Sequence, residues 1–206
     1  MPMSLPVPIK PYEIKDGPGK HVVYPQVYNM ANQSLQAFIN QSIVRNTQQL
    51  IDMQTNDMSG NIAEMVGGFE MKNNQRNVLS LTLSNYAIPY MAANGMTYMN
   101  SLTFDLMNGN ECRLSDLFKP RSNYTQRISA IIQKQIAERD IPTIHNFTGI
   151  SPQQSFYIAD KTLVIYFQPL EFTPHVFGIP TFPISVYELQ DIIPENSPLS
   201  RMAMNN

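Results

Sequence analysis

Several residue types that support common chemistries are scarce in this sequence. It has no tryptophan, one cysteine (Cys112) and three histidines (His21, His145 and His175) in 206 residues. A lone cysteine excludes an intrachain disulfide, and histidines in three separate segments lack the spacing that metal sites need. We therefore expect no metal and no cofactor, and we interpret Cys112 as a small hydrophobic residue.

Charge is also scarce, at 15% of residues with a net charge of −2. The nearest approach to a basic cluster, formed by Arg113, Lys119 and Arg121, is interrupted by Asp116. Nucleic-acid binding needs a continuous basic face, so we expect no nucleic-acid partner. No stretch reaches the roughly 18 apolar residues of a membrane span. Without such a span or a signal-peptide pattern, we expect a cytoplasmic protein, and the oligomeric state stays open.

Hydrophobic periodicity predicts the elements of an α+β fold, a twisted antiparallel sheet with helices packed on one side. Helical spacing is seen over residues 32–52, with Asn32 as the N-cap, and over residues 122–138. A third helix is expected to end near residue 193. The predicted strands lie over residues 21–24, 64–72, 79–84, 97–106, 112–114, 156–158, 163–167 and 180–186. This order is not a β-α-β alternation, so a doubly wound nucleotide-binding fold is disfavoured.

Turn residues divide the strands. Gly67-Gly68 indicates a bulge, Asn73-Asn74 a turn and Asn108-Gly109 a tight hairpin. Asp160-Lys161 indicates a further hairpin turn. In the strand over residues 79–84, leucines alternate with serine and threonine, the pattern of a half-buried strand.

Tyrosine and methionine are concentrated in one short stretch that contains Asn94-Gly95. The candidate ligand-contact residues are Tyr86, Tyr90, Met91, Asn94, Met96 and Tyr98. Tyrosine and methionine are over-represented at adaptable contact surfaces. The alternative interpretation is that most of these side chains fill the core between the sheet and the helices.

Three carboxylates near one predicted hairpin form the candidate acidic group of a hydrolase. Asp105, Glu111 and Asp116 could in principle provide acid–base chemistry. Structural roles also explain all three, since Asp116 falls in the first turn of a short predicted helix, where the helix dipole favours negative charge. No Gly-x-Ser-x-Gly motif and no glycine-rich phosphate loop accompany them. We therefore predict no catalytic residue.

Three blocks of sequence resemble a known family. Residues 102–109 (LTFDLMNG) with 114–118 (LSDLF), residues 156–158 (FYI) with 163–167 (LVIYF), and residues 24–27 (YPQV) resemble the RsiV-like C-terminal domain family and the short domain that precedes it. Members are found in lysozyme-sensing anti-sigma factors and beside PdaC-type peptidoglycan deacetylase modules. The resemblance implies a twisted antiparallel sheet packed by helices, and a non-catalytic role. It carries over no individual contact residue.

Together, pattern and resemblance suggest four segments. Residues 1–20 are an extended proline-rich arm, 21–90 an N-terminal subdomain, 91–193 the RsiV-like subdomain, and 194–206 a flexible tail. The expected function is a non-catalytic binding or sensing module for a protein or cell-wall-related ligand. The alternatives are a hydrolase or hydrolase-accessory domain acting on cell-wall glycan, and a structural protein of the cell or spore interior.

Overall fold

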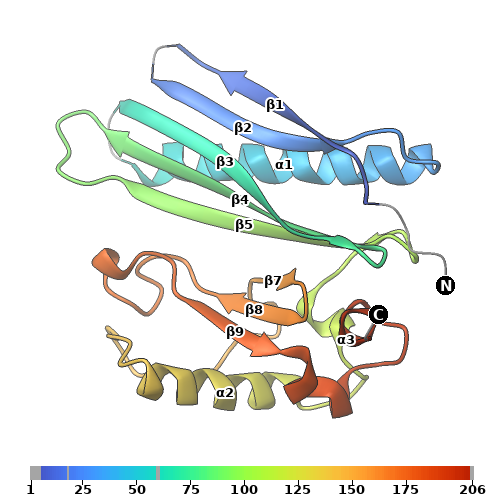
Figure 1. Cartoon of the computed structure of the whole chain (residues 1–206). Coiled ribbons are helices and arrows are strands. Elements are labelled where there is room, and N and C mark those ends of the chain that lie inside the picture. Colours follow the sequence, from blue (N-terminus) through green and yellow to red (C-terminus); the bar gives the residue numbers. More distant parts are fainter. Residues whose placement is uncertain (1–5, 18, 59–60, 205–206) are drawn as a thin grey trace.

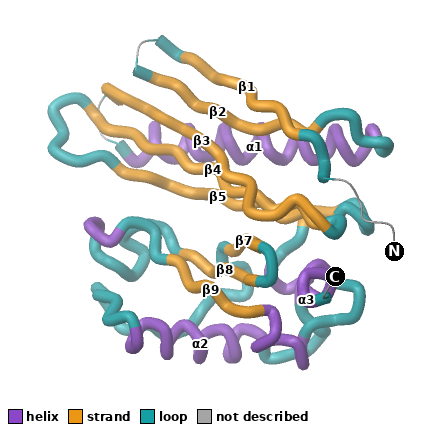
Figure 2. The backbone as a smooth tube through the Cα atoms, viewed as in Figure 1, coloured by secondary structure: helices purple, strands orange, loops and turns teal. Residues whose placement is uncertain are grey.

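The computed structural model describes residues 6–17, 19–58 and 61–204. Its layers follow one another as a long helix, a six-stranded sheet, a three-stranded sheet and a second helix (Figures 1 and 2). The fold class is α+β, as predicted. The helices do not lie on one side of a single sheet, however, because each of the two sheets has its own helix.

The element bounds are as follows. The first sheet holds β1 (Ile9–Lys15), β2 (Lys20–Val27), β3 (Ile62–Gln75), β4 (Val78–Pro89), β5 (Met96–Asp105) and β6 (Asn110–Glu111) in that order, and the second holds β7 (Phe156–Ala159), β8 (Thr162–Tyr166) and β9 (Thr181–Ser185). The α-helices are α1 (Gln33–Asp57), α2 (Tyr124–Glu138) and α3 (Pro198–Ala203), and the 3₁₀ helices are η1 (Leu114–Leu117), η2 (His175–Phe177) and η3 (Val186–Ile192).

Helix α1 covers one face of the first sheet. The Asn32 side chain accepts a hydrogen bond from the Leu35 backbone N–H at 3.0 Å, so the predicted N-cap is confirmed. One turn apart, Ile39 and Ile43 are fully buried and pack in one cluster with Leu81 and its neighbours on β4. Strands β2 and β3 run parallel and are joined through α1, which gives a single β-α-β unit in an otherwise antiparallel sheet.

The other face of the first sheet is polar and is also buried. Ser80 and Thr103 lie on it with their hydroxyl oxygens 2.8 Å apart, and both are buried. Strand β7, at the edge of the second sheet, lies against this face: the Ile158 N–H donates to Ser80 Oγ at 3.0 Å, and the Ser101 hydroxyl donates to the Phe156 carbonyl. Hydroxyls of one sheet therefore satisfy the outward backbone groups of the other.

Helix α2 covers the far face of the second sheet. Ile128 and Ile132 are fully buried in one core cluster with Phe182 and Ile184 of β9, which agrees with the helical spacing predicted over residues 122–138. Past the helix end, the Arg139 guanidinium donates to the Thr181 carbonyl at 2.9 Å. This contact caps a backbone group on the outer edge of β9.

Both predicted terminal segments differ from the structure. Within the proline-rich arm, β1 pairs with β2 along its whole length, from Ile9 opposite Val27 to Lys15 opposite His21. Within the predicted flexible tail, residues 198–203 form α3, and Leu199 is fully buried. Residues 1–5 and 205–206 of these two segments lie outside the described residues.

The division of the chain also differs from the expected one. The proposed boundary at 90/91 falls in the turn between β4 and β5, which pair over ten residue positions in one sheet. The chain leaves the first sheet only after β6, and the second sheet begins with β7.

Two of the predicted turn features were wrong. Gly67 and Gly68 pair regularly with Asn85 and Ser84, and the register shifts lie elsewhere on β3. Gly67 is required for close packing instead: a Cβ there would lie 2.5 Å from Val22 Cγ1. The turn expected at Asn73-Asn74 lies at Arg76-Asn77, whose φ angles are 55° and 57°.

Candidate functional site

The six candidate contact residues lie at the tip of the β4–β5 hairpin and on the strand ends that lead to it. Between Pro89 and Met96, the chain exposes Tyr90 (70% exposed), Met91 (103%) and Asn94. Met91 adopts a φ of 60°, a left-handed conformation that costs a non-glycine residue roughly 1–2 kcal/mol. The structure thus places three of the six side chains at the surface of one hairpin tip.

The other three candidates are half-buried and support the tip. Tyr98 packs against the α1 core, and burial followed by its hydrogen bond to Asp57 raises its pKa above the usual value. Gly95 lies so close to Tyr86 that an added Cβ would be 2.5 Å from the tyrosine ring. Tyr86 thus packs against the backbone of the tip at Gly95, and Tyr98 belongs to the core beneath α1.

A second loop, between β8 and β9, lies beside the tip. The His175 Nε2 atom is 3.1 Å from the Gly95 carbonyl oxygen, and the neighbouring Val176 side chain is 91% exposed. We call Tyr90, Met91 and Val176 the tip surface. Val176 could not be predicted as part of this surface, because the contact between the two loops joins residues 80 positions apart in the chain.

The three carboxylates of the candidate acidic group do not all meet in one site. Asp105 is 2% exposed and forms an ion pair with Arg201 of α3, with 2.7 Å between Nη2 and Oδ1. It also accepts hydrogen bonds from the Met107 N–H at 3.0 Å and from Asn108 Nδ2 at 2.8 Å. Asp105 thus closes the β5–β6 turn and holds α3.

The other two carboxylates also have structural partners. Asp116 accepts a hydrogen bond from the Arg113 N–H at 2.9 Å, which caps the start of η1, and Glu111 lies 3.9 Å from Arg45. Asp105 and Asp116 line one hollow with Cys112, but Glu111 is not among its lining residues. Burial, with the charge of Asp105, raises the pKa of the Cys112 thiol to about 12, which disfavours a reactive thiolate.

The described part of the chain holds neither a metal-binding cluster nor a membrane-spanning helix. Across residues 6–17, 19–58 and 61–204, no three His, Cys, Asp or Glu side chains gather in a way that could hold a metal ion. Over the same residues, no helix has the length and apolarity that crossing a bilayer requires.

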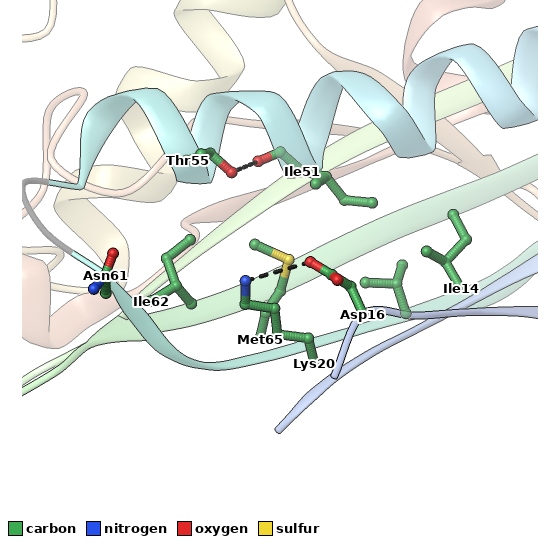
Figure 3. Close-up of a pocket in the computed structure, with 9 residues that line it drawn as sticks. Ile14, Asp16, Lys20, Ile51, Thr55, Asn61, Ile62 and Met65 are labelled. Carbon is green, nitrogen blue, oxygen red and sulfur yellow. Dashed lines mark hydrogen bonds and ion pairs between the residues drawn. The ribbon is translucent and has the colours of Figure 1, made fainter. Parts of the chain in front are cut away.

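A small apolar pit lies between the C-terminal half of α1 and the ends of β1, β2 and β3 (Figure 3). Ile14, Ile51 and Met65 line it, and the ion pair between Lys20 Nζ and Asp16, at 3.4 Å, lies at its rim. Its lining residues Asp16, Lys20 and Asn61 lie within two positions of residues 18 and 59–60 in the sequence, which the structure does not describe. We therefore assign it no ligand.

A second hollow, which we call the edge groove, lies beside β5 between the two sheets. Its volume is about 420 Å³. Its main lining residues are Asn46, Asn100, Ser101, Arg113, Gln154 and Tyr166. Carboxamide and hydroxyl groups predominate among these side chains, and Arg113 carries the one charge in the lining of this hollow.

Known proteins resemble the chain in fold more than in sequence. A member of the DUF3298 family from Bacteroides fragilis has a TM-score of 0.69 at 12% identity, covering 95% of this chain and 97% of that one. A DUF3298 family protein from Pseudomonas aeruginosa has a TM-score of 0.65 at 12% identity, covering 93% and 96%. No curated protein matches the sequence significantly. Residues 115–187, from η1 into η3, match the model of the family described as "Protein of unknown function (DUF3298)".

Proposed function

We propose that the protein is a non-catalytic binding module that contacts a protein or cell-wall-related ligand through the tip surface. The observation that carries this proposal is the exposure of Met91 and Val176, at 103% and 91%, on two loops joined by the contact between His175 and Gly95. Exposed apolar side chains on two loops that contact each other are candidates for an interaction site.

The chemistry of the tip surface suits a protein partner. Met91 is flexible and polarisable, and Tyr90 combines an apolar ring with a hydroxyl, as at adaptable interfaces. The left-handed backbone of Met91 has a conformational cost, and such costs cluster at functional sites. The resemblance to the RsiV-like family, whose domains recognise a protein ligand, supports the same class of partner.

Calorimetric titration tests the proposal, with lysozyme and soluble muropeptides as the first two probes. The wild type is compared with the double variant Met91→Ser/Val176→Ser, which removes the two most exposed apolar side chains. Val44→Ser is the matched control, since Val44 is 41% exposed on α1 and is not part of the tip. Binding that the double variant loses and the control keeps supports the proposal. Binding that survives in the double variant, or no heat with either probe, counts against it.

A further inference from the structure

The outer edge of β5 is open over a short stretch. β5 pairs with β4 from Met96 to Asp105, but with β6 only at Phe104 and Asp105. Beyond this pairing, the Thr103 carbonyl accepts a hydrogen bond from the Cys112 N–H at 2.7 Å. The Gln168 side chain covers the edge at Met99. Its Oε1 atom accepts a hydrogen bond from the Met99 N–H at 3.2 Å, and its Nε2 atom donates one to the Met99 carbonyl at 2.6 Å.

Ser101 lies between these two covered positions. Outward-facing backbone groups recur every second residue along a strand, so the N–H and carbonyl of Ser101 point outward like those of Met99 and Thr103. The register between β4 and β5 is unbroken here, which keeps this alternation intact. Neither backbone group of Ser101 has an outward hydrogen-bond partner within the described residues. The edge groove lies directly beside it.

The walls of the edge groove suit a peptide backbone. Asn46 and Asn100 line it from α1 and β5, and Gln153 and Gln154 line it from the segment before β7. Gln154 Nε2 already donates to the Tyr166 carbonyl and Asn46 Nδ2 to the Ser42 carbonyl, both at 2.9 Å. Gln153 and Asn100 therefore offer the donor and acceptor groups that a peptide unit needs. The two aromatic lining residues, Phe156 and Tyr166, are 8% and 1% exposed, so no exposed ring is available to stack on a flat ligand.

The charge of the edge groove indicates the side chain that a ligand would carry. Arg113 is exposed and lies where the chain leaves the edge of β5, and no carboxylate lines the groove. An arginine in a groove whose other lining residues are uncharged favours a carboxylate, which it can bind with two parallel hydrogen bonds.

From these observations, we infer that the edge groove binds an extended, carboxylate-bearing peptide segment that pairs with β5 at Ser101. The peptide adds main-chain hydrogen bonds to the open edge, its backbone is also held by the carboxamides of Gln153 and Asn100, and its carboxylate contacts Arg113. This site goes beyond the proposed function, because it uses none of the residues of the tip surface.

A positional-scanning library of synthetic octapeptides, blocked at both ends, is the probe. We expect members with Asp or Glu at one position to bind more tightly than about 1 mM. In the bound state, hydrogen exchange at the Ser101 amide slows, while exchange at Leu102, whose backbone faces β4, stays unchanged. Exchange at Ser101 that is unaffected by a bound peptide would overturn the inference, as would a library without a binding member.

Arg113→Gln supplies the side-chain test, with Arg121→Gln as the matched control on an arginine that does not line the groove. We expect Arg113→Gln to weaken acidic peptides by about tenfold and to leave their neutral counterparts unchanged. Equal loss in both variants, or preferential binding of neutral chito-oligosaccharides in the groove, contradicts the inference. Met91→Ser/Val176→Ser is expected to leave peptide binding intact, so failure of this site and failure of the tip surface are distinguishable.

Discussion

Arg201 of α3 and Asp105 at the end of β5 form an ion pair whose nitrogen and oxygen atoms lie 2.7 Å apart. The side chains are 6% and 2% exposed, so water screens the pair little. Arg201 also donates to the backbone carbonyls of Arg76, at 3.1 Å, and Asn196, at 2.6 Å. One arginine thus joins the C-terminal helix, the β3–β4 turn and the β5–β6 turn.

Removing the arginine leaves a buried carboxylate without its counter-charge. We expect Arg201→Met to lower the free energy of unfolding by about 3–5 kcal/mol. Urea denaturation of Arg201→Met, of Asp105→Asn and of the double variant Asp105→Asn/Arg201→Met measures the coupling between the two residues. The double variant should lose less stability than the sum of the single variants. Strict additivity would show that the pair does not act as a unit.

Adjacent glycines on β3 offer a matched comparison of packing. In Gly67→Ala, the new methyl group would lie 2.5 Å from Val22 Cγ1 and 2.9 Å from Asn85 Oδ1, whereas nothing lies within 4 Å of a Cβ at Gly68. We expect Gly67→Ala to destabilise the protein by about 1–3 kcal/mol. Gly68→Ala should leave stability equal or slightly higher, since alanine loses less backbone entropy than glycine. Thermal unfolding of both variants checks this, and equal melting temperatures would contradict the close approach.

The buried thiol of Cys112 predicts an alkaline effect on stability. Its folded-state pKa of about 12 lies above the value of about 8.5 for an unfolded cysteine. Between these values the unfolded chain has released the proton and the folded chain still holds it, so stability falls as the pH rises. Relative to Cys112→Ala, the wild type should lose up to about 1.4 kcal/mol per pH unit above pH 9 and nothing below pH 8. Urea unfolding at pH 7.5, 9.5 and 10.5 measures this difference, and a constant offset would refute it.

The features that could be predicted from the sequence are those in which a single element sets its own pattern. The Asn32 cap, the isoleucine stripe of α2 and the β7–β8 hairpin at Asp160 all depend on neighbours a few residues apart, and the structure contains each of them. Local spacing is visible in one sequence.

Features that depend on distant contacts could not be predicted. Ser80 and Thr82 alternate with leucines as if they faced water, yet both are buried because the second sheet, more than 70 residues later, covers them. The pairing of Arg201 with Asp105 and the contact of His175 with Gly95 likewise have no local signal. The start of α3 does have a local signal, since Ser197 caps the helix and Pro198 occupies its first turn.

The affinity ratio between the wild type and Met91→Ser/Val176→Ser tests the proposed binding role most directly. It is obtained by calorimetric titration with lysozyme or a soluble muropeptide, with Val44→Ser as the reference. Because a few exposed anchors carry most of the binding energy of an interface, we predict at least a tenfold (about 1.4 kcal/mol) loss in the double variant. Equal affinity in all three proteins would show that the tip surface is not the binding site.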